Sequence, residues 1–239
     1  VEAPAAVGAA GWPVRFIPGI LQGLSQGMAV LPTQQFGAGD LRGMNRSNAM
    51  TLLICLASGV VLMGVGMLVS EPLMLLINTT PDLMPDALAY LRIMLCGTLP
   101  VTVYNVFACF LQAMGNGRTP LVSMFTASVV NIVLDLVFIL VFDWGVPGAA
   151  WATVIAQVIS CIPCVYVYIK LPASDFSAEV WKLDWKLIAR LLRTGAPLGF
   201  LRLMIGIGGM IVQSVVNGFG MIVVAGYTAA TPLQGLLEI

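Results

Sequence analysis

Residues 120–142 read PLVSMFTASVVNIVLDLVFILVF, an apolar run that contains one carboxylate, Asp135, near its middle. A helix needs about 20 mostly apolar residues to cross the hydrocarbon core of a bilayer, and this run is long enough. Five further runs of similar length flank it, at 13–36, 47–69, 88–113, 148–169 and 195–218. The sequence therefore predicts an all-α fold, a polytopic transmembrane bundle of about six spanning helices.

The composition agrees with a protein that lives in a lipid bilayer. Residues of the AVILMFWYC set make up 59% of the chain and charged residues only 9%, whereas a soluble domain carries about 25% charge. The net charge is zero, which argues against a nucleic-acid partner. The chain has no histidine, and without histidine only lysines outside the helices could act as a base. We therefore expect no enzyme activity and no organic cofactor.

The basic residues predict which connections face the cytoplasm. Most of them lie in three alternate connections between the apolar runs, and cytoplasmic loops are the ones enriched in Lys and Arg. These residues are Arg42, Arg46, Arg118, Lys170, Lys182, Lys186, Arg190 and Arg193. The connections that carry Asp82, Asp86 and Asp143 should then lie outside. We expect a multi-pass protein of the cell membrane, that is, the inner or plasma membrane.

The chain also shows signs of an internal duplication. AAVGAA at 5–10 and AGYTAA at 225–230 each precede an apolar run, and duplicated helix bundles are common in secondary transporters. We predict a first bundle over 1–170 that lacks its first helix, a cytoplasmic amphipathic linker over 171–194, and the start of a second bundle over 195–239. The last helix should lean away from the others, and the chain should be a fragment whose partners are missing helices of the same polypeptide.

The linker prediction rests on residues 175–193, where apolar residues recur at helical spacing with basic residues between them. Such a segment is typical of a helix lying on the membrane surface. A linker helix packed on the bundle is the alternative.

Asp135 is the main polar group at mid-membrane depth. A charged carboxylate there costs about 2.5–3.5 kcal/mol on insertion scales, so it should face the bundle interior. Asn131 and Ser128 share its helical face, and their oxygens together suit a Na⁺ ion or a proton. The alternative is that Asp135 only accepts a structural hydrogen bond between helices.

Further polar pairs recur on the other apolar runs, and they favour a shared polar cavity over isolated interhelical hydrogen bonds. The predicted lining residues are Ser128, Gln157, Gln34, Gln213 and Asn217. Gly19, Gly23 and Gly27 form a stripe of small residues that predicts close helix packing.

Several stretches resemble the multidrug and toxin extrusion (MATE) transporters in order and spacing. They are GAGD at 37–40, AYLRIMLCGTLP at 89–100, LQAMGNGRTPL at 111–121, NIVLD at 131–135 and GVPGAAWATVIAQ at 145–157. The resemblance covers nearly the whole chain. It implies helices two to seven of a twelve-helix protein built from two six-helix bundles, and hence a partial MATE-type fold.

The resemblance also implies a function. Such transporters export cationic or amphiphilic drugs in exchange for H⁺ or Na⁺, and Asn131, Asp135 and Thr153 match three of their ion-site residues by position. A Na⁺ ion would then bind at Asp135 and Asn131, while the family's acid on helix one has no counterpart here.

Two other classes remain as alternatives. A lipid-linked saccharide flippase should show several basic residues in its cavity, yet Arg202 is the only one deep in a predicted helix. A non-transporting membrane scaffold would leave the pairing of Asp135 with Asn131 unexplained.

Overall fold

The computed structural model describes residues 7–8, 10–77, 79, 81–175, 177–219, 223–224, 226–227 and 230. These residues form helices joined by short connections, and no strand occurs in this described part of the chain, so the all-α prediction is confirmed. The elements are α2 (Gly11–Met28), α3 (Val30–Gly37), α4 (Leu41–Leu76), α5 (Met84–Cys96), α6 (Thr98–Ala113), α7 (Arg118–Leu136), the π-helical turn η1 (Val137–Val141), α8 (Gly145–Lys170) and α9 (Trp185–Asn217).

Four of these helical segments are long and apolar enough to cross a membrane. They are α4, α7 continued by η1, α8 and α9, and the bent pair α5–α6 makes a fifth if it counts as one span. The remaining predicted run, 13–36, is built as α2 and α3. It carries Arg15, Gln22 and Gln26 and does not meet the same criterion of length and hydropathy.

Two proline residues explain where the broken helices break. Pro32 and Pro100 have no N–H to donate to the carbonyl four residues earlier, and the α-helix is interrupted at Ala29 and Gly97, three residues before each, although both keep φ and ψ angles of the right-handed helical region. The bend between α5 and α6 at Gly97 is 42°. Pro18 and Pro163 lie within the continuous helices α2 and α8.

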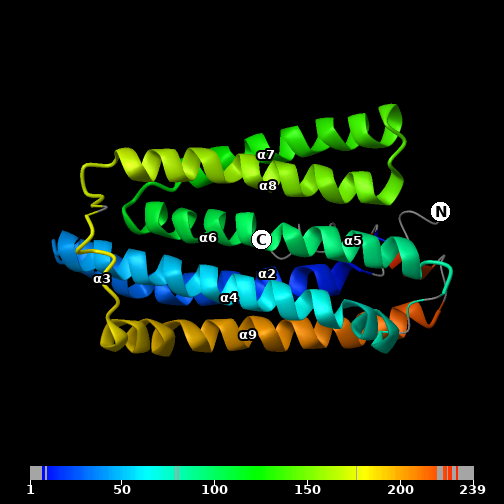
Figure 1. Ribbon diagram of the computed structural model, residues 1–239, viewed down its shortest axis with the longest axis horizontal. Helices are drawn as coiled ribbons and strands as arrows, with labels where there is room; N and C mark the ends of the chain where they lie inside the picture. The colour runs from blue at the N-terminus through cyan, green and yellow to red at the C-terminus, as the bar shows by residue number, and fades with distance from the viewer. Residues whose placement is uncertain are drawn as a thin grey trace.

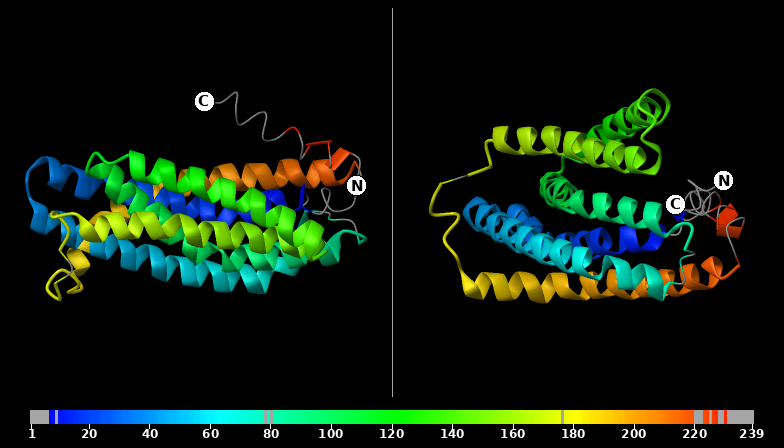
Figure 2. Two further views of the ribbon diagram at one scale, coloured as in Figure 1. Left: turned by 90° about the horizontal axis from the view of Figure 1, so that it is seen from above. Right: turned by 45° about the vertical axis from the view of Figure 1, so that its right-hand side comes forward.

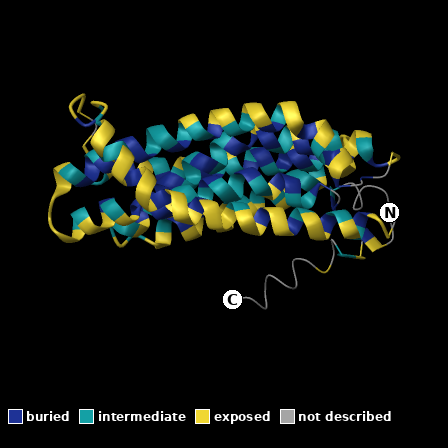
Figure 3. Cartoon of the chain, turned by 90° about the horizontal axis from the view of Figure 1, so that it is seen from below, coloured by how far each residue is buried: buried dark blue, intermediate teal, exposed yellow. Residues whose placement is uncertain are grey.

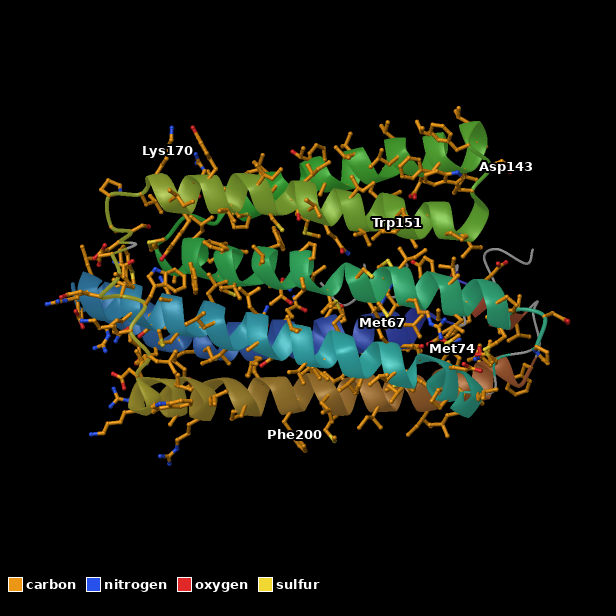
Figure 4. All side chains as sticks on the ribbon, in the orientation of Figure 1. Met67, Met74, Asp143, Trp151, Lys170 and Phe200 are labelled. Atoms are coloured by element: carbon orange, nitrogen blue, oxygen red, sulfur yellow. The ribbon has the colours of Figure 1, made fainter. Side chains whose placement is uncertain are left out.

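The helices run along one axis and pack from one edge of the bundle to the other (Figure 1). A hairpin of α7 and α8 forms one edge, α5 and α6 follow, then α2 and α4, and α9 forms the opposite edge. The right-hand view of Figure 2 separates the α7–α8 hairpin from the other helices. Buried residues lie between the helices and exposed ones on the outer faces (Figure 3). Phe200 on α9 points outward (Figure 4) and is 62% exposed, as expected for a lipid-facing side chain.

The prediction that the last helix leans away from the others is wrong. α9 lies at the edge of the bundle, but it packs along α2 through glycines on both helices. A Cβ atom on Gly27 would lie 2.8 Å from the Cα of Gly195, and one on Gly23 would lie 2.6 Å from the carbonyl oxygen of Leu198. Gly19 has nothing within 4 Å of that position. The glycine stripe therefore brings two backbones together at two of its three positions.

A separate amphipathic helix over 175–193 is also wrong. The described residues between α8 and α9 form turns, and α9 begins at the N-cap Asp184, whose carboxylate accepts hydrogen bonds from the N–H groups of Lys186 and Leu187. The connection between α8 and α9 is hydrogen-bonded to the start of α4. The side-chain amide of Asn45 donates to the carbonyl of Ala173 at 2.8 Å, and Val180 is only 3% exposed.

Two ion pairs add to this attachment, Arg42 with Glu179 and Arg46 with Asp184. The part before Asp184 thus docks on the bundle as turns in place of the helix that we expected, whereas residues 185–193 are helical as the first turns of α9.

Candidate functional site

A cavity with a volume of about 710 Å³ lies among α2, α6, α7, α8 and α9. Aromatic side chains form part of its wall, namely Trp12, Phe16 and Tyr104. Its volume falls in the range of about 300–1,000 Å³ that is usual for small-molecule sites. The cavity is therefore large enough for a drug-sized molecule.

Two of the three predicted ion-site residues, Asn131 and Thr153, come together where α7 packs on α8, whereas Asp135 is not among the residues that line the cavity. The side-chain amide of Asn131 donates a long hydrogen bond of 3.4 Å to the hydroxyl of Thr153, which in turn donates to the Ala149 carbonyl at 3.0 Å. Asn131 and Thr153 both line the cavity. Asp135 follows Asn131 by one turn on α7, just before η1.

The carboxylate of Asp135 keeps one oxygen free. Its Oδ1 atom is buried and has no hydrogen-bond partner among the described residues. A buried acceptor of this kind is expensive to leave unsatisfied, and a proton or a bound cation would satisfy it. Carboxylate, amide and hydroxyl oxygens are also the ligands that hard cations prefer. No cluster of three or more His, Cys, Asp and Glu side chains occurs within the described ranges, so the site offers a single charged ligand.

Five residues were predicted to line a polar cavity, and the structure places two of them at the cavity wall and three elsewhere. Ser128 and Gln157 are at the cavity wall. Gln34 is exposed on α3, outside the cavity lining.

Gln213 and Asn217 also lie outside the cavity. Gln213 is buried and donates to the Asn217 side chain at 2.8 Å, and Asn217 donates to the carbonyl of Ile77 at 2.9 Å. These two residues hold the end of α9 to the end of α4. They therefore make hydrogen bonds between helices and do not line the cavity, which was the alternative to the prediction.

Two residues of the cavity wall were not predicted as such from the sequence. Arg15 on α2 and Arg202 on α9 both line the cavity. Arg15 could not be placed at the cavity from the sequence, because nothing in the sequence sets it opposite α9.

Comparison with known proteins gives one family. The family model MatE matches residues 2–137. The probable multidrug resistance protein YpnP of Bacillus subtilis is 33% identical over 218 residues, which cover 91% of this chain and 48% of YpnP. The probable multidrug resistance protein YoeA of the same organism is 28% identical, over 90% of this chain and 48% of YoeA.

Solved structures agree with the sequence comparison. An inward-facing multidrug resistance MATE family transporter of the MOP superfamily superposes with a TM-score of 0.89 at 25% identity, over 99% of this chain and 56% of that protein. A MOP superfamily transporter from Pyrococcus furiosus, described as having a binding pocket of reverse polarity, superposes with a TM-score of 0.84 at 26% identity, over 97% of this chain and 52% of that protein. The chain spans about half the length of the curated relatives it matches.

Proposed function

Because this chain belongs to the MatE family, we propose that it forms part of a secondary active antiporter that exports cationic or amphiphilic drugs in exchange for H⁺ or Na⁺. It is an integral membrane protein of helices, and its matched relatives are named as multidrug resistance proteins. We place it in the cell membrane, acting without a chemical step on the substrate and without a cofactor other than the coupling ion. The division into a first bundle up to residue 170 and the start of a second bundle belongs to the same proposal, with α9, which begins at Trp185, as the first helix of the second bundle.

The observation that carries the exchange mechanism is the free buried oxygen of Asp135, one helical turn beyond Asn131, which lines the cavity. Asn131 and Thr153, one turn away and across the α7–α8 contact, supply neutral oxygens next to it. Protonation removes a charge from the interior and lets the helices close around a neutral site. Loss of the proton, or binding of Na⁺, favours a wetter cavity that holds the drug.

In this scheme the ion and the drug act on one two-state bundle. Coupling between two ligands requires that each bind the two states with different affinity. The ion does so through Asp135, and the drug does so through the cavity lined by α2, α7 and α9.

The test is export of ethidium from membrane vesicles under an imposed H⁺ or Na⁺ gradient, using the protein as its natural gene encodes it. Asp135→Asn keeps the shape of the side chain and loses its titration, so we expect insertion to persist and gradient-driven export to stop. Asp143→Asn is a matched control, because Asp143 lies in the connection between η1 and α8 with a φ of 53°, a conformation that Asn adopts readily. Export at the natural rate by Asp135→Asn under both gradients would show that the carboxylate is structural.

A further inference from the structure

Two aromatic rings of α2 lie at the outer end of the cavity. Trp12 and Phe16 both line it, and Trp12 is the lining residue nearest the start of α2, which faces outside in the predicted topology. Each ring rests on a glycine of α9, because a Cβ atom on Gly209 would overlap the indole of Trp12 and one on Gly206 would overlap the ring of Phe16. The atoms that meet these glycines are ring carbons. Lifting the rings therefore exposes apolar surface but breaks no hydrogen bond at these two points.

The cytoplasmic end of α9 is held by backbone contact and by polar bonds. A Cβ on Gly27 of α2 would lie 2.8 Å from the Cα of Gly195, so the two backbones meet there. The start of α9 is also tied to α4, because the Asp184 carboxylate pairs with Arg46 at 3.4 Å. The connection that precedes α9 is hydrogen-bonded to α4 at Asn45. α9 is thus fixed where it begins, whereas side-chain contacts hold its other end.

We propose that Trp12 and Phe16 form the outer gate of the cavity. The gate opens when α9 tilts about its cytoplasmic contact with α2 and carries Gly206 and Gly209 away from the rings. The rise from Gly195 to Gly209 is about 21 Å, so a tilt of about 15° moves Gly209 by about 5 Å. This inference deepens the proposed function by naming the parts that move between its two states. It rests on that function in taking the cavity to be the substrate path.

A hydrogen bond at the end of α9 belongs to the closed gate. The Asn217 side chain donates to the Ile77 carbonyl at 2.9 Å and joins α9 to the end of α4, beyond the two rings. A tilt of α9 has to break this bond as well. Both groups lie at the outer ends of their helices, where water can replace the lost partner. The closed state therefore combines an apolar seal with a polar bond on its outer side.

The first measurement follows access to the cavity from outside. Starting from the protein as its natural gene encodes it, the native cysteines are replaced and one cysteine is placed at Ser128 on the cavity wall. Its rate of reaction with an impermeant maleimide, added to right-side-out vesicles, reports the opening of the gate. Gly206→Ala and Gly209→Ala each put a methyl group where a ring rests, so each should raise this rate by about fivefold or more. Gly208→Ala is the matched control, because nothing lies within 4 Å of its Cβ position and the rate should stay unchanged.

Trp12→Ala tests the ring directly. It creates no overlap, so it remains informative even if alanine at Gly209 prevents folding. Removal of the indole should also raise the reaction rate from outside. Adding Gly209→Ala to this variant should change the rate no further, since the ring that the methyl group displaces is already gone.

The second measurement tests the pivot at the cytoplasmic end. Spin labels on exposed residues of the two opposite edges of the bundle report each end separately by double electron–electron resonance. The outer pair is Leu140 of η1 with Phe219, just after α9, and the cytoplasmic pair is Leu121 of α7 with Lys186 of α9. In Gly209→Ala the distance between the outer labels should lengthen by about 5 Å, whereas the distance between the cytoplasmic labels should stay constant.

An unchanged rate from outside in Gly206→Ala and Trp12→Ala, or an equal rise in Gly208→Ala, would overturn the gate. Lengthening between the cytoplasmic labels with a constant outer distance would overturn the pivot. Both measurements are made without an ion gradient and without a drug. Export that persists in Asp135→Asn would therefore contradict the proposed antiport and leave the gate in place, and the reverse also holds.

Discussion

Gly27→Ala tests the contact between α2 and α9 at a point where a glycine of each helix meets the other. The new Cβ would lie 2.8 Å from the Cα of Gly195 and 2.9 Å from the carbonyl oxygen of Thr194. Carbon atoms in favourable contact are about 3.5–4.0 Å apart, so α9 must move away by about 1 Å. The obstacle is backbone on both sides, which cannot rotate out of the way as a side chain can.

The magnitude follows from comparison with Gly19→Ala on the same helix. Both changes gain about 0.5–1 kcal/mol of helical stability, because alanine loses less backbone freedom than glycine on folding. At Gly19 nothing lies within 4 Å of the added atom, so only the gain remains. At Gly27 overpacking subtracts about 1–3 kcal/mol. The difference between the two variants therefore isolates the cost of the contact.

The assay is thermal unfolding of both variants in one detergent and at one heating rate, followed by the loss of the monodisperse peak in size-exclusion chromatography. A change of 1 kcal/mol shifts Tm by about 2–4 °C in chains of 150–250 residues, and by less in longer ones. We expect the Tm of Gly27→Ala to fall several degrees below that of Gly19→Ala. If the two variants melt together, α9 does not pack on α2 through this glycine and the arrangement described above is wrong.

Three further predictions address the site, the outer end of α9 and the topology. Asn131→Ala and Thr153→Ala should each slow gradient-driven ethidium export without abolishing it, since each removes one neutral oxygen; complete loss in either would contradict this. Asn217→Ala leaves the Ile77 carbonyl without its donor and should lower stability by about 1–3 kcal/mol, seen as a reduced Tm; an unchanged Tm would count against the bond. In a variant without native cysteines, a cysteine at Asn116 should react with an impermeant maleimide only from the cytoplasm and one at Asp82 only from outside; labelling of Asn116 from outside would reverse the topology.

Much of the fold could be predicted because the apolar runs, and the glycine and proline residues between them, are local signals in the sequence. Gly39, Gly115 and Gly145 adopt positive φ angles in three of the predicted connections, where glycine is the residue that does so without strain. The same signal places the start of the last predicted run at Gly195, which is wrong for the helix. Gly195 and Pro197 both lie inside α9, where Gly195 contacts α2.

The segment before α9 shows the limit of periodicity. Its apolar residues recur at helical spacing, yet the Asp175 carboxylate accepts a hydrogen bond from the Ser177 N–H at 2.8 Å and stabilises a turn. Val180 then buries itself beside Phe107, Phe110 and Tyr168. Docking on the bundle replaced the surface helix, and the sequence alone does not reveal that docking site.

The candidate site likewise contains residues that the sequence could place together and residues that it could not. Asn131 and Thr153 could be placed together because α7 and α8 form a hairpin with a short connection. Arg15 and Arg202 could not be placed together from the sequence, because they belong to helices far apart in the chain. An i, i+4 pair such as Gln213 and Asn217 is equally compatible with a cavity wall and with a bond to a neighbouring helix. Only the position of Ile77 decides between them.

The α2–α9 contact also sets an order of events during synthesis. The two glycines that meet, Gly27 and Gly195, are separated by about 170 residues, and a ribosome adding about 5–20 residues each second needs roughly 8–35 s to make that length. During this interval α2 has no partner for its small-residue face, and Arg15 has no α9 beside it. Lipid, the insertion machinery or a chaperone must shield that face until α9 arrives. α9 thus completes the packing of α2 only after the helices between them have been made.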